Sequence, residues 1–306
     1  MAPSISRLAR HGRDASTIIA SALVVVLVTR AESISTAVGE AGQRMTTLFA
    51  VSNDGTRIAY DVTGTGPAVV LLHGGGQSRQ AWHEAGYVGR LRDQFTVVTM
   101  DLRGHGESDK PTRVDAYAIG RLTDDILAVV DTAHMTRFAV WGYSYGGNIA
   151  RYLPARSDRV TKLVIVGIPV GPAAAPPFRE LILDLRAKWT PIVEADRAGT
   201  LDLSSLSTED RALWQTGTPL GAIPVTLAWL SAMLDWPSVE PVDLRCSTLW
   251  LVGTGNENAM SSVREYSERL GRTKVVLQLM PGLTHEEELY EVDDAFPPML
   301  QFTRSP

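Results

Sequence analysis

The sequence of 306 residues contains a single cysteine, Cys246. One cysteine excludes an intrachain disulfide, and it excludes a zinc site built from several thiolates. A lone cysteine at the start of an apolar run is typical of a small buried hydrophobic side chain. No other cluster of zinc-type ligands is visible in the sequence. We therefore expect neither a disulfide framework nor a metal site.

Positive charge is also scarce. Lys and Arg number 29 against 34 Asp and Glu, which gives a formal net charge of −5 and an isoelectric point of about 5.7. A diffuse negative charge offers no attraction for a phosphate backbone. The composition therefore argues against nucleic acid as a partner. Nothing in the sequence indicates an oligomeric state.

Long hydrophobic runs are missing as well. The apolar run Ile18–Val28 is too short for a spanning helix, which needs about 20 apolar residues. We therefore predict no stable membrane span. The run belongs to a leader, residues 1–44, that we expect to lie outside the fold as a disordered or signal-like segment. Recognisable domain sequence begins only at Met45.

Two interpretations of the leader remain open. Three arginines before the apolar run and the small residues Ser35-Thr36-Ala37 after it resemble a signal peptide, which predicts export if residues 1–37 are cleaved. Alternatively, Met45 is the true start and the protein is cytoplasmic. We take the cytoplasmic interpretation as the prediction. A protein that begins at Met45 is then expected to fold and keep full activity.

After Met45, short strand-like runs alternate with amphipathic segments. Most of the strand-like runs lack polar alternation, which suits strands that are covered on both faces of a parallel sheet. An opening hairpin followed by strand–helix alternation predicts an open α/β sheet. The last amphipathic segment, residues 286–302, is expected to break at Pro297-Pro298. The expected strands are Thr47–Ser52, Arg57–Val62, Ala68–Leu72, Phe95–Met100, Phe138–Trp141, Leu163–Val166, Thr248–Val252 and Val275–Met280.

The alternation is interrupted once, by a helix-stopping stretch from Gly171 to Pro177. About seventy residues of mostly helical pattern follow before the sheet resumes. We predict a helical cap over residues 172–241, inserted into a core formed by residues 45–171 and 242–306. Four tryptophans fall in this insert, and we expect them to form core between cap and sheet rather than ligand contacts. They are Trp189, Trp214, Trp229 and Trp236.

The sequence Gly142-Tyr-Ser144-Tyr-Gly146 lies between a predicted strand and a predicted helix. A serine at the tip of such a sharp turn must adopt a strained backbone conformation to expose its hydroxyl. The flanking positions then approach too closely for side chains, which explains glycine at both. The helix that follows directs its free N–H groups toward whatever reacts with the serine. Ser144 is therefore the candidate nucleophile.

With this motif, the sequence resembles the α/β-hydrolase family. Three further segments match in the expected order: His73-Gly74-Gly75-Gly76, the turn Asp101–Ser108, and Gly282-Leu-Thr-His285. The resemblance covers nearly everything after Met45. It implies the α/β-hydrolase fold, a mostly parallel central sheet with helices on both faces and a helical cap insertion. Within the turn we expect Asp101 and Arg103 to be structural.

The resemblance also implies the base. In this fold the catalytic residues follow in the order serine, acid, histidine. Only His285 follows Ser144 among the six histidines. An imidazole within hydrogen-bond reach has a suitable pKa to take the serine proton. We therefore assign His285 as the general base.

The acid that should orient His285 does not follow the usual pattern of the family. The family usually carries an aspartate three residues after the glycine that ends the strand Thr248–Val252, where this chain has Asn256. The next residue, Glu257, has a longer side chain, and we take it as the candidate acid that orients His285. An ordinary solvated carboxylate at Glu257, and hence a Ser–His dyad, is the alternative. An asparagine alone would supply no charge to the imidazolium.

By resemblance, the oxyanion hole consists of the backbone N–H groups of Gly75 and Tyr145. Gly74, Trp82 and Tyr143 lie beside these groups in the sequence and are expected to contact the substrate. The alternative for the glycines is a tight turn that merely requires them. The pocket is predicted to be apolar.

These features predict a serine hydrolase that cleaves an ester or lactone of a small apolar molecule through an acyl-enzyme, with no cofactor. Three alternatives remain. Cofactor-free perhydrolase or haloperoxidase chemistry uses the same triad, and so does carbon–carbon bond hydrolysis. A ligand-binding module with little turnover would follow from an incomplete acid. The serine argues against epoxide hydrolases and haloalkane dehalogenases, whose resembling members carry aspartate at this turn.

Overall fold

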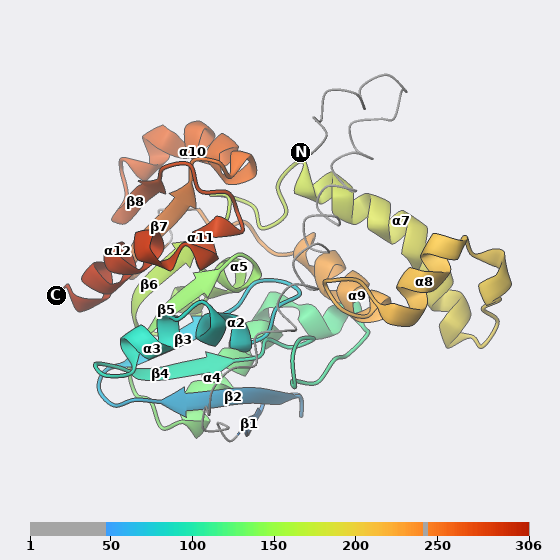
Figure 1. Cartoon of the computed structure of the whole chain (residues 1–306), viewed down its shortest axis with the longest axis horizontal. Coiled ribbons are helices and arrows are strands. Elements are labelled where there is room, and N and C mark those ends of the chain that lie inside the picture. The colour runs from blue at the N-terminus through green and yellow to red at the C-terminus, as the bar shows by residue number, and fades with distance from the viewer. Residues whose placement is uncertain (1–46, 241–243, 306) are drawn as a thin grey trace, which may run out of the picture.

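A computed structural model of the chain describes residues 47–240 and 244–305. The leader predicted over residues 1–44, together with Met45, lies outside the described residues. Those residues form one eight-stranded sheet in the order β1-β2-β4-β3-β5-β6-β7-β8 (Figure 1). β1 and β2 pair antiparallel, β2 pairs antiparallel with β4, and the remaining neighbours are parallel. The strands are β1 (Leu48–Val51), β2 (Arg57–Thr63), β3 (Ala68–Leu72), β4 (Thr96–Met100), β5 (Phe138–Tyr143), β6 (Val160–Val166), β7 (Ser247–Gly253) and β8 (Val275–Met280).

Helices cover both faces of the sheet, because neighbouring residues of a buried strand point to opposite sides. In β3, Val70 and Leu72 pack in the cluster that includes α4, α5 and α10. Val69 and Leu71 pack in the opposite cluster, with α2, α3 and α12. The predicted α/β-hydrolase fold is therefore confirmed. The helices of this core are α2 (Gln80–Glu84), α3 (Tyr87–Leu91), α4 (Ile119–Thr132), α5 (Tyr145–Ala150), α6 (Leu153–Arg156), α10 (Glu257–Leu270), α11 (Glu287–Tyr290) and α12 (Val292–Arg304).

The final amphipathic segment breaks at a different place from the one expected. The chain leaves helical geometry at Glu291, where ψ is 66°, and not at the proline pair. Pro297 and Pro298 lie inside α12. The turn at Glu291 separates α11 from α12. It thereby leaves the short segment around α11 at the carboxyl edge of the sheet.

Between β6 and β7 the chain forms a helical insertion, in which Figure 1 shows α7, α8 and α9 grouped beside the sheet. These helices are α7 (Phe178–Arg197), α8 (Thr208–Thr216) and α9 (Ile223–Met233). The assignment of residues 172–241 as a cap stays a prediction. Among the described residues, no helix is both long and apolar enough to cross a membrane.

Candidate active site

Ser144 occupies the sharp turn between β5 and α5. Its backbone has φ 50° and ψ −117°, a conformation that side-chain-bearing residues rarely adopt. The turn is tight enough to need its glycines. A Cβ on Gly146 would lie 2.3 Å from the carbonyl oxygen of Leu72, and one on Gly142 would lie 2.7 Å from the carbonyl oxygen of Gly146. The strained turn holds the Ser144 hydroxyl at the carboxyl edge of the sheet.

A chain of short contacts starts at this hydroxyl. Ser144 Oγ lies 2.9 Å from Nε2 of His285, and Nδ1 of the same ring lies 2.9 Å from Oε2 of Glu288. The carboxylate is fully buried, whereas the His285 side chain is 46% exposed. His285 follows β8, and Glu288 lies three residues later, in α11. The structure thus brings together the predicted serine and histidine, and it adds a glutamate that the sequence reasoning missed.

Three further contacts hold the Glu288 carboxylate. The backbone N–H of Gly253, at the end of β7, donates to Oε1 at 2.6 Å. The amide nitrogen of Asn256 lies 3.1 Å from each carboxylate oxygen. A buried carboxylate needs such donors, because an unpaired charge is costly away from water. These donors therefore fix the position of the carboxylate that faces His285.

Asn256 contributes an amide where the family usually carries the acid. Its Oδ1 accepts the N–H of Ala259 at 3.2 Å and so caps the start of α10. This bond fixes the orientation of the amide, so that Nδ2 faces Glu288. Nδ2 also lies 3.2 Å from Nδ1 of His285. Both atoms are donors when Nδ1 carries its proton, and Asn256 therefore acts on the imidazole through Glu288.

The expectation that Glu257 is the acid is not met by the geometry. Its side chain is 82% exposed, and its Oε2 lies 3.7 Å from Arg264 on the same helix. Glu257 starts the first turn of α10, directly after the capping residue, and this places it at the solvent side. The carboxylate against His285 belongs to Glu288. The signal that could have found it is the spacing of three residues from His285, since residues i and i+3 share a helix face.

The end of β5 and the turn after β6 both lie close to the imidazole of His285. The Tyr143 ring stacks on it at 5.2 Å between ring centres, and the Tyr143 hydroxyl donates to the His285 carbonyl oxygen at 2.7 Å. On another side lies Gly167, after β6, with φ 77°. A Cβ there would lie 2.3 Å from Oε2 of Glu288 and 3.0 Å from Nδ1 of His285. Tyr143, which was expected to contact substrate, instead supports the histidine.

The two expected oxyanion donors are the amide of Tyr145, directly after the serine, and the amide of Gly75, in the loop after β3. Within the described residues, neither the Gly75 amide nor the Tyr145 amide donates to a protein acceptor. Gly74 differs, because its amide donates to Oε1 of Gln77 at 2.8 Å and its carbonyl accepts from Nδ1 of His73 at 2.7 Å. Gly74 thus shapes the turn, and the Gly75 and Tyr145 amides stay available for a developing negative charge.

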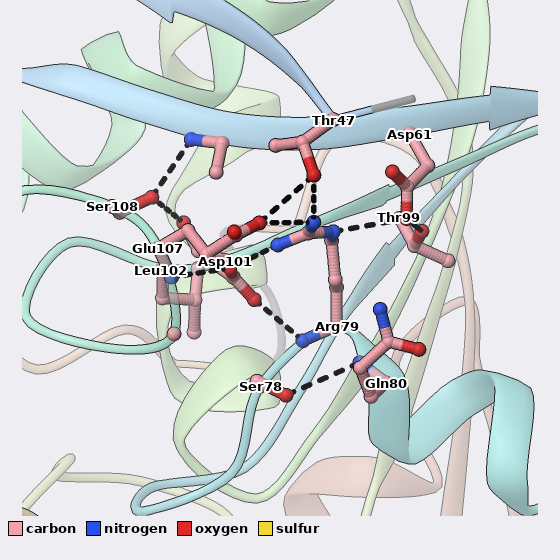
Figure 2. A network of polar contacts seen from close by, with 12 residues as sticks. Thr47, Asp61, Ser78, Arg79, Gln80, Thr99, Asp101, Leu102, Glu107 and Ser108 are labelled. Atoms are coloured by element: carbon pink, nitrogen blue, oxygen red, sulfur yellow. Dashed lines mark hydrogen bonds and ion pairs between the residues drawn. The ribbon is translucent and has the colours of Figure 1, made fainter. Parts of the chain in front are cut away.

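A buried arginine anchors the loop that carries Gly75 (Figure 2). The Arg79 guanidinium pairs with Asp61 at 2.9 Å, with Glu107 at 2.6 Å, and with Asp101. The Arg79 amide also donates to Oδ1 of Asp101 at 2.7 Å. These bonds connect the loop after β3 to β2 and to the turn after β4. Asp101 and Glu107 belong to that turn, so Asp101 is structural, as expected.

Arg79 also favours the ionised form of Asp61. Burial opposes ionisation of Asp61, but a hydrogen bond from His83 and the charge of Arg79 outweigh it and lower the Asp61 pKa. The side chains of Arg79, Asp61 and Asp101 are 6%, 2% and 0% exposed, respectively. Loss of the guanidinium would leave two buried carboxylates without their cation. The network therefore holds the oxyanion loop, the loop that carries Gly75, in place. Removing Arg79 is expected to destabilise this loop.

Two further histidines are buried beneath this loop. Burial lowers the pKa of His73 to about 4 and that of His105 to about 3. Both rings are thus neutral near pH 7. His73 donates from Nδ1 to Gly74 and accepts the Leu102 N–H on Nε2 at 3.0 Å. In the same way, His105 Nδ1 faces the carbonyl oxygen of Arg103 at 3.1 Å. This leaves a lone pair on Nε2 of His105.

Trp82 does not line the site as expected. It is 1% exposed and packs edge-on against Tyr87, with 4.9 Å between ring centres, in the core beneath α2. The aromatic residue next to the oxyanion loop is Trp229 of α9. Its ring lies 2.9 Å from the position that a Cβ on Gly75 would take. The sequence could not indicate this contact, because Trp229 lies more than 150 residues away in the helical insertion.

The chain is similar to several known proteins over part of its length. The chain is 41% identical over 116 residues to an uncharacterised protein of Mycobacterium tuberculosis (strain ATCC 25618 / H37Rv), covering 37% of this chain and 32% of that protein. It is 33% identical over 119 residues to a soluble epoxide hydrolase of Corynebacterium sp. (strain C12), covering 39% and 40%. The chain thus matches about a third of the length of the first of these relatives.

A solved structure shares the fold over most of the chain. The thermophilic esterase from Thermogutta terrifontis superposes with a TM-score of 0.63 and 22% identity, over 85% of this chain and 98% of that one. With its eight-stranded sheet and the serine at the strained turn after β5, the chain has the α/β-hydrolase fold, and its residues 67–204 match the model of that family.

Proposed function

We propose that this chain is a serine hydrolase that cleaves an ester or lactone of a small, mainly apolar substrate through an acyl-enzyme. The observation that carries the proposal is the continuous set of contacts from Ser144 Oγ through His285 to the buried Glu288 carboxylate. Each distance is within hydrogen-bond range, so proton transfer needs no large movement. Glu288 takes the acid role that the sequence assigned to Glu257.

In the first half of the reaction, Ser144 Oγ attacks the ester carbonyl carbon while His285 Nε2 takes the hydroxyl proton. The carbonyl oxygen becomes negative and accepts hydrogen bonds from the Gly75 and Tyr145 amides. Glu288 stabilises the imidazolium and keeps its tautomer. The carbon–oxygen bond to the leaving alcohol then breaks, and His285 gives the proton to that alcohol. The acyl group remains on Ser144.

In the second half, His285 takes a proton from water, and the resulting hydroxide adds to the acyl carbon. The bond to Ser144 breaks, the proton returns to Ser144 Oγ, and a carboxylic acid leaves. Apart from substrate and water, the scheme uses only side chains and backbone amides of this chain. It consumes one water per ester and yields one acid and one alcohol.

The serine supports acyl transfer over epoxide opening, although several relatives carry epoxide hydrolase names. Attack on an epoxide by a serine would leave an ether on the enzyme, and an ether has no carbonyl for water to attack. Attack on an ester leaves a second ester, which water can cleave. The buried acid also supports an enzyme over a binding module, because an incomplete acid was the reason for that alternative.

The test uses the full-length protein and its Ser144→Ala variant. Both are treated with a fluorophosphonate probe and assayed on nitrophenyl esters of increasing chain length. We expect labelling and turnover of the wild-type protein and neither in the variant. Equal turnover in the two proteins would refute the proposal, and so would the absence of labelling and turnover in both.

A further inference from the structure

Three aromatic side chains beside the oxyanion loop have buried polar atoms without a partner. They are His105 from the turn after β4, Tyr145 from the start of α5, and Trp229 from α9. Each is 3% exposed. Among the described residues, Nε2 of His105, the Tyr145 hydroxyl and Nε1 of Trp229 make no hydrogen bond. Buried polar atoms normally have partners, so a group of three needs an explanation.

The three rings form one contacting group, the aromatic triplet. Tyr145 and Trp229 lie 4.7 Å apart between ring centres, His105 and Trp229 5.5 Å apart, and His105 and Tyr145 5.7 Å apart. The triplet adjoins both expected oxyanion donors. Tyr145 itself carries one of the amides, and the Trp229 ring lies against Gly75, which carries the other. A bound acyl group would therefore lie close to these rings.

A neighbouring tryptophan shows that such atoms can be satisfied in this part of the fold. Trp236 stacks on Tyr145 with 5.9 Å between ring centres, yet its Nε1 donates to the carbonyl oxygen of Tyr117 at 3.2 Å. Tyr152, which packs on Trp236, likewise donates its hydroxyl to the Pro237 carbonyl at 2.6 Å. Among these contacting rings, the polar atoms without a partner therefore all belong to the triplet. The other described side chains with such atoms lie outside it, and they are Ser52, Asp61, Trp82, Arg151 and Arg211.

The chemistry of the three atoms indicates the kind of group they suit. The Trp229 indole is a donor only, the Tyr145 hydroxyl can donate or accept, and the neutral His105 ring presents a lone pair on Nε2. None of the three is charged near pH 7. An ionised ligand group would lose its hydration there without gaining an opposite charge. A neutral hydroxyl, which both accepts and donates, fits this set.

The strand order indicates which part of the substrate would lie at the triplet. In the sheet, β5 with Ser144 has β3 and β4 on one side and β6, β7 and β8 on the other. His285 follows β8 and must lie near the leaving alcohol in order to protonate it. His105 follows β4, on the opposite side of the serine. The triplet is thus on the side away from the leaving group.

Building on the proposed hydrolase function, we propose that His105, Tyr145 and Trp229 form a subsite for a hydroxyl group on the acyl chain. The preferred substrates are then esters or lactones of short hydroxy acids. The rest of the acyl chain is apolar. In this subsite the hydroxyl accepts from the donors of Trp229 and Tyr145 and donates to His105 Nε2.

The experiment compares pairs of nitrophenyl esters in which a hydroxyl replaces a methyl group of similar size, such as 3-hydroxybutanoate and 3-methylbutanoate. Pairs with the hydroxyl at the second and fourth carbons vary its position. The readout is the ratio of kcat/KM for the hydroxy ester to that for the methyl ester. We expect a ratio of about ten or more for at least one pair, because a site with buried polar atoms rejects an analogue that leaves them unpaired.

The variants Tyr145→Phe and Trp229→Phe each remove one polar atom. We expect each to lower the ratio by about fivefold or more, whereas Trp236→Phe, which removes an indole N–H that already has a partner, leaves the ratio unchanged. A wild-type ratio near one for all pairs would overturn the subsite. So would a ratio that stays constant in the Tyr145 and Trp229 variants, which would assign the three atoms to buried water.

If the wild-type protein hydrolyses neither ester of any pair, the subsite is tested by binding alone. The proposed function fails as well if the fluorophosphonate probe also leaves the wild-type protein unlabelled. Isothermal titration calorimetry of the Ser144→Ala variant with the two esters then decides. Tighter binding of the hydroxy ester, reduced by Trp229→Phe in the same background, would support the subsite. Equal binding, or no binding of either ester, would overturn it.

Discussion

Oε2 of Glu288 accepts a hydrogen bond from Nδ1 of His285, three residues earlier in the chain, at 2.9 Å. The base and its orienting carboxylate thus come from one short segment after β8. The family usually takes the acid from the loop after β7. In this protein that loop supplies donors, the Gly253 amide and the Asn256 side chain, which hold the carboxylate in place.

Replacing the carboxylate of Glu288 should abolish most of the turnover. Glu288→Gln keeps the shape but removes the charge that stabilises the imidazolium, and we expect kcat to fall by about 10³- to 10⁴-fold. Glu257→Gln is the matched control on the exposed glutamate, and we expect its kcat to stay within about twofold of wild type. Steady-state kinetics on a nitrophenyl ester measure both, with circular dichroism to verify folding. The opposite pattern would restore Glu257 as the acid.

The acid should be movable to position 256. Nδ2 of Asn256 lies 3.2 Å from Nδ1 of His285, so a carboxylate oxygen at the same place would be within reach of the imidazole. We expect the double variant Asn256→Asp, Glu288→Gln to have a kcat about tenfold or more above that of Glu288→Gln alone. A double variant that is no more active than the single one would show that position 256 cannot orient His285.

The single variant Asn256→Asp should change the pH dependence of kcat. It replaces a donor with a second carboxylate about 3 Å from Glu288, and two like charges at this distance raise the pKa of one of them. The pair would then retain a proton near neutral pH. We expect kcat to fall at pH 6 and to recover partly at pH 8 to 9, when the pair loses that proton. A pH–rate profile identical to that of the wild type would contradict this coupling.

Removing the Arg79 guanidinium should weaken both the fold and the oxyanion loop. Arg79→Met leaves Asp61 and Asp101 buried without their cation, and breaking such a pair costs about 3–5 kcal/mol in free energy of unfolding. Arg90→Met removes a more exposed pair, with Asp293, and we expect a change below about 1 kcal/mol. Urea unfolding measures both variants. Similar losses for the two arginines would contradict a special role for the buried network.

Stability should fall as the pH decreases from 7 to 5. Burial lowers the pKa of His73 to about 4 and that of His105 to about 3, whereas an unfolded histidine titrates near 6.5. Below pH 6.5 the unfolded chain therefore binds more protons than the folded one, and folding loses stability. We expect the free energy of unfolding to be lower at pH 5 than at pH 7 by about 2 kcal/mol for each of the two imidazoles. Urea unfolding of His105→Gln should show about half the wild-type loss, and an unchanged loss would exclude His105 as a source.

Much of the fold could be predicted from the sequence, because buried parallel strands are continuous apolar runs. β3 and β8 have the bounds that the sequence predicts, and the strain at Ser144 follows from its glycine neighbours. The break near α12 was misplaced because proline removes a helix donor but does not fix where the chain turns. That turn lies at Glu291, six residues before Pro297.

The site was predictable where its parts follow the ends of strands, as Ser144 and His285 do. The acid was missed for a local reason. Three consecutive glutamates, residues 286–288, follow His285, and composition does not distinguish them. Only the helical turn selects Glu288, because it brings that side chain beneath the ring and buries it completely. The approach of Trp229 to Gly75 depends on how the insertion packs, and short-range sequence patterns do not encode it.

The close approach of Gly167 to Glu288 also constrains how this sequence can diverge. Any side chain at position 167 would occupy the space of the Glu288 carboxylate, so the two positions cannot change independently. A lineage that moved the acid to the loop after β6 would first have to give up the glutamate at position 288. Related sequences with glutamate at 288 should therefore carry glycine at 167, and a side chain at 167 should occur only where that glutamate is absent.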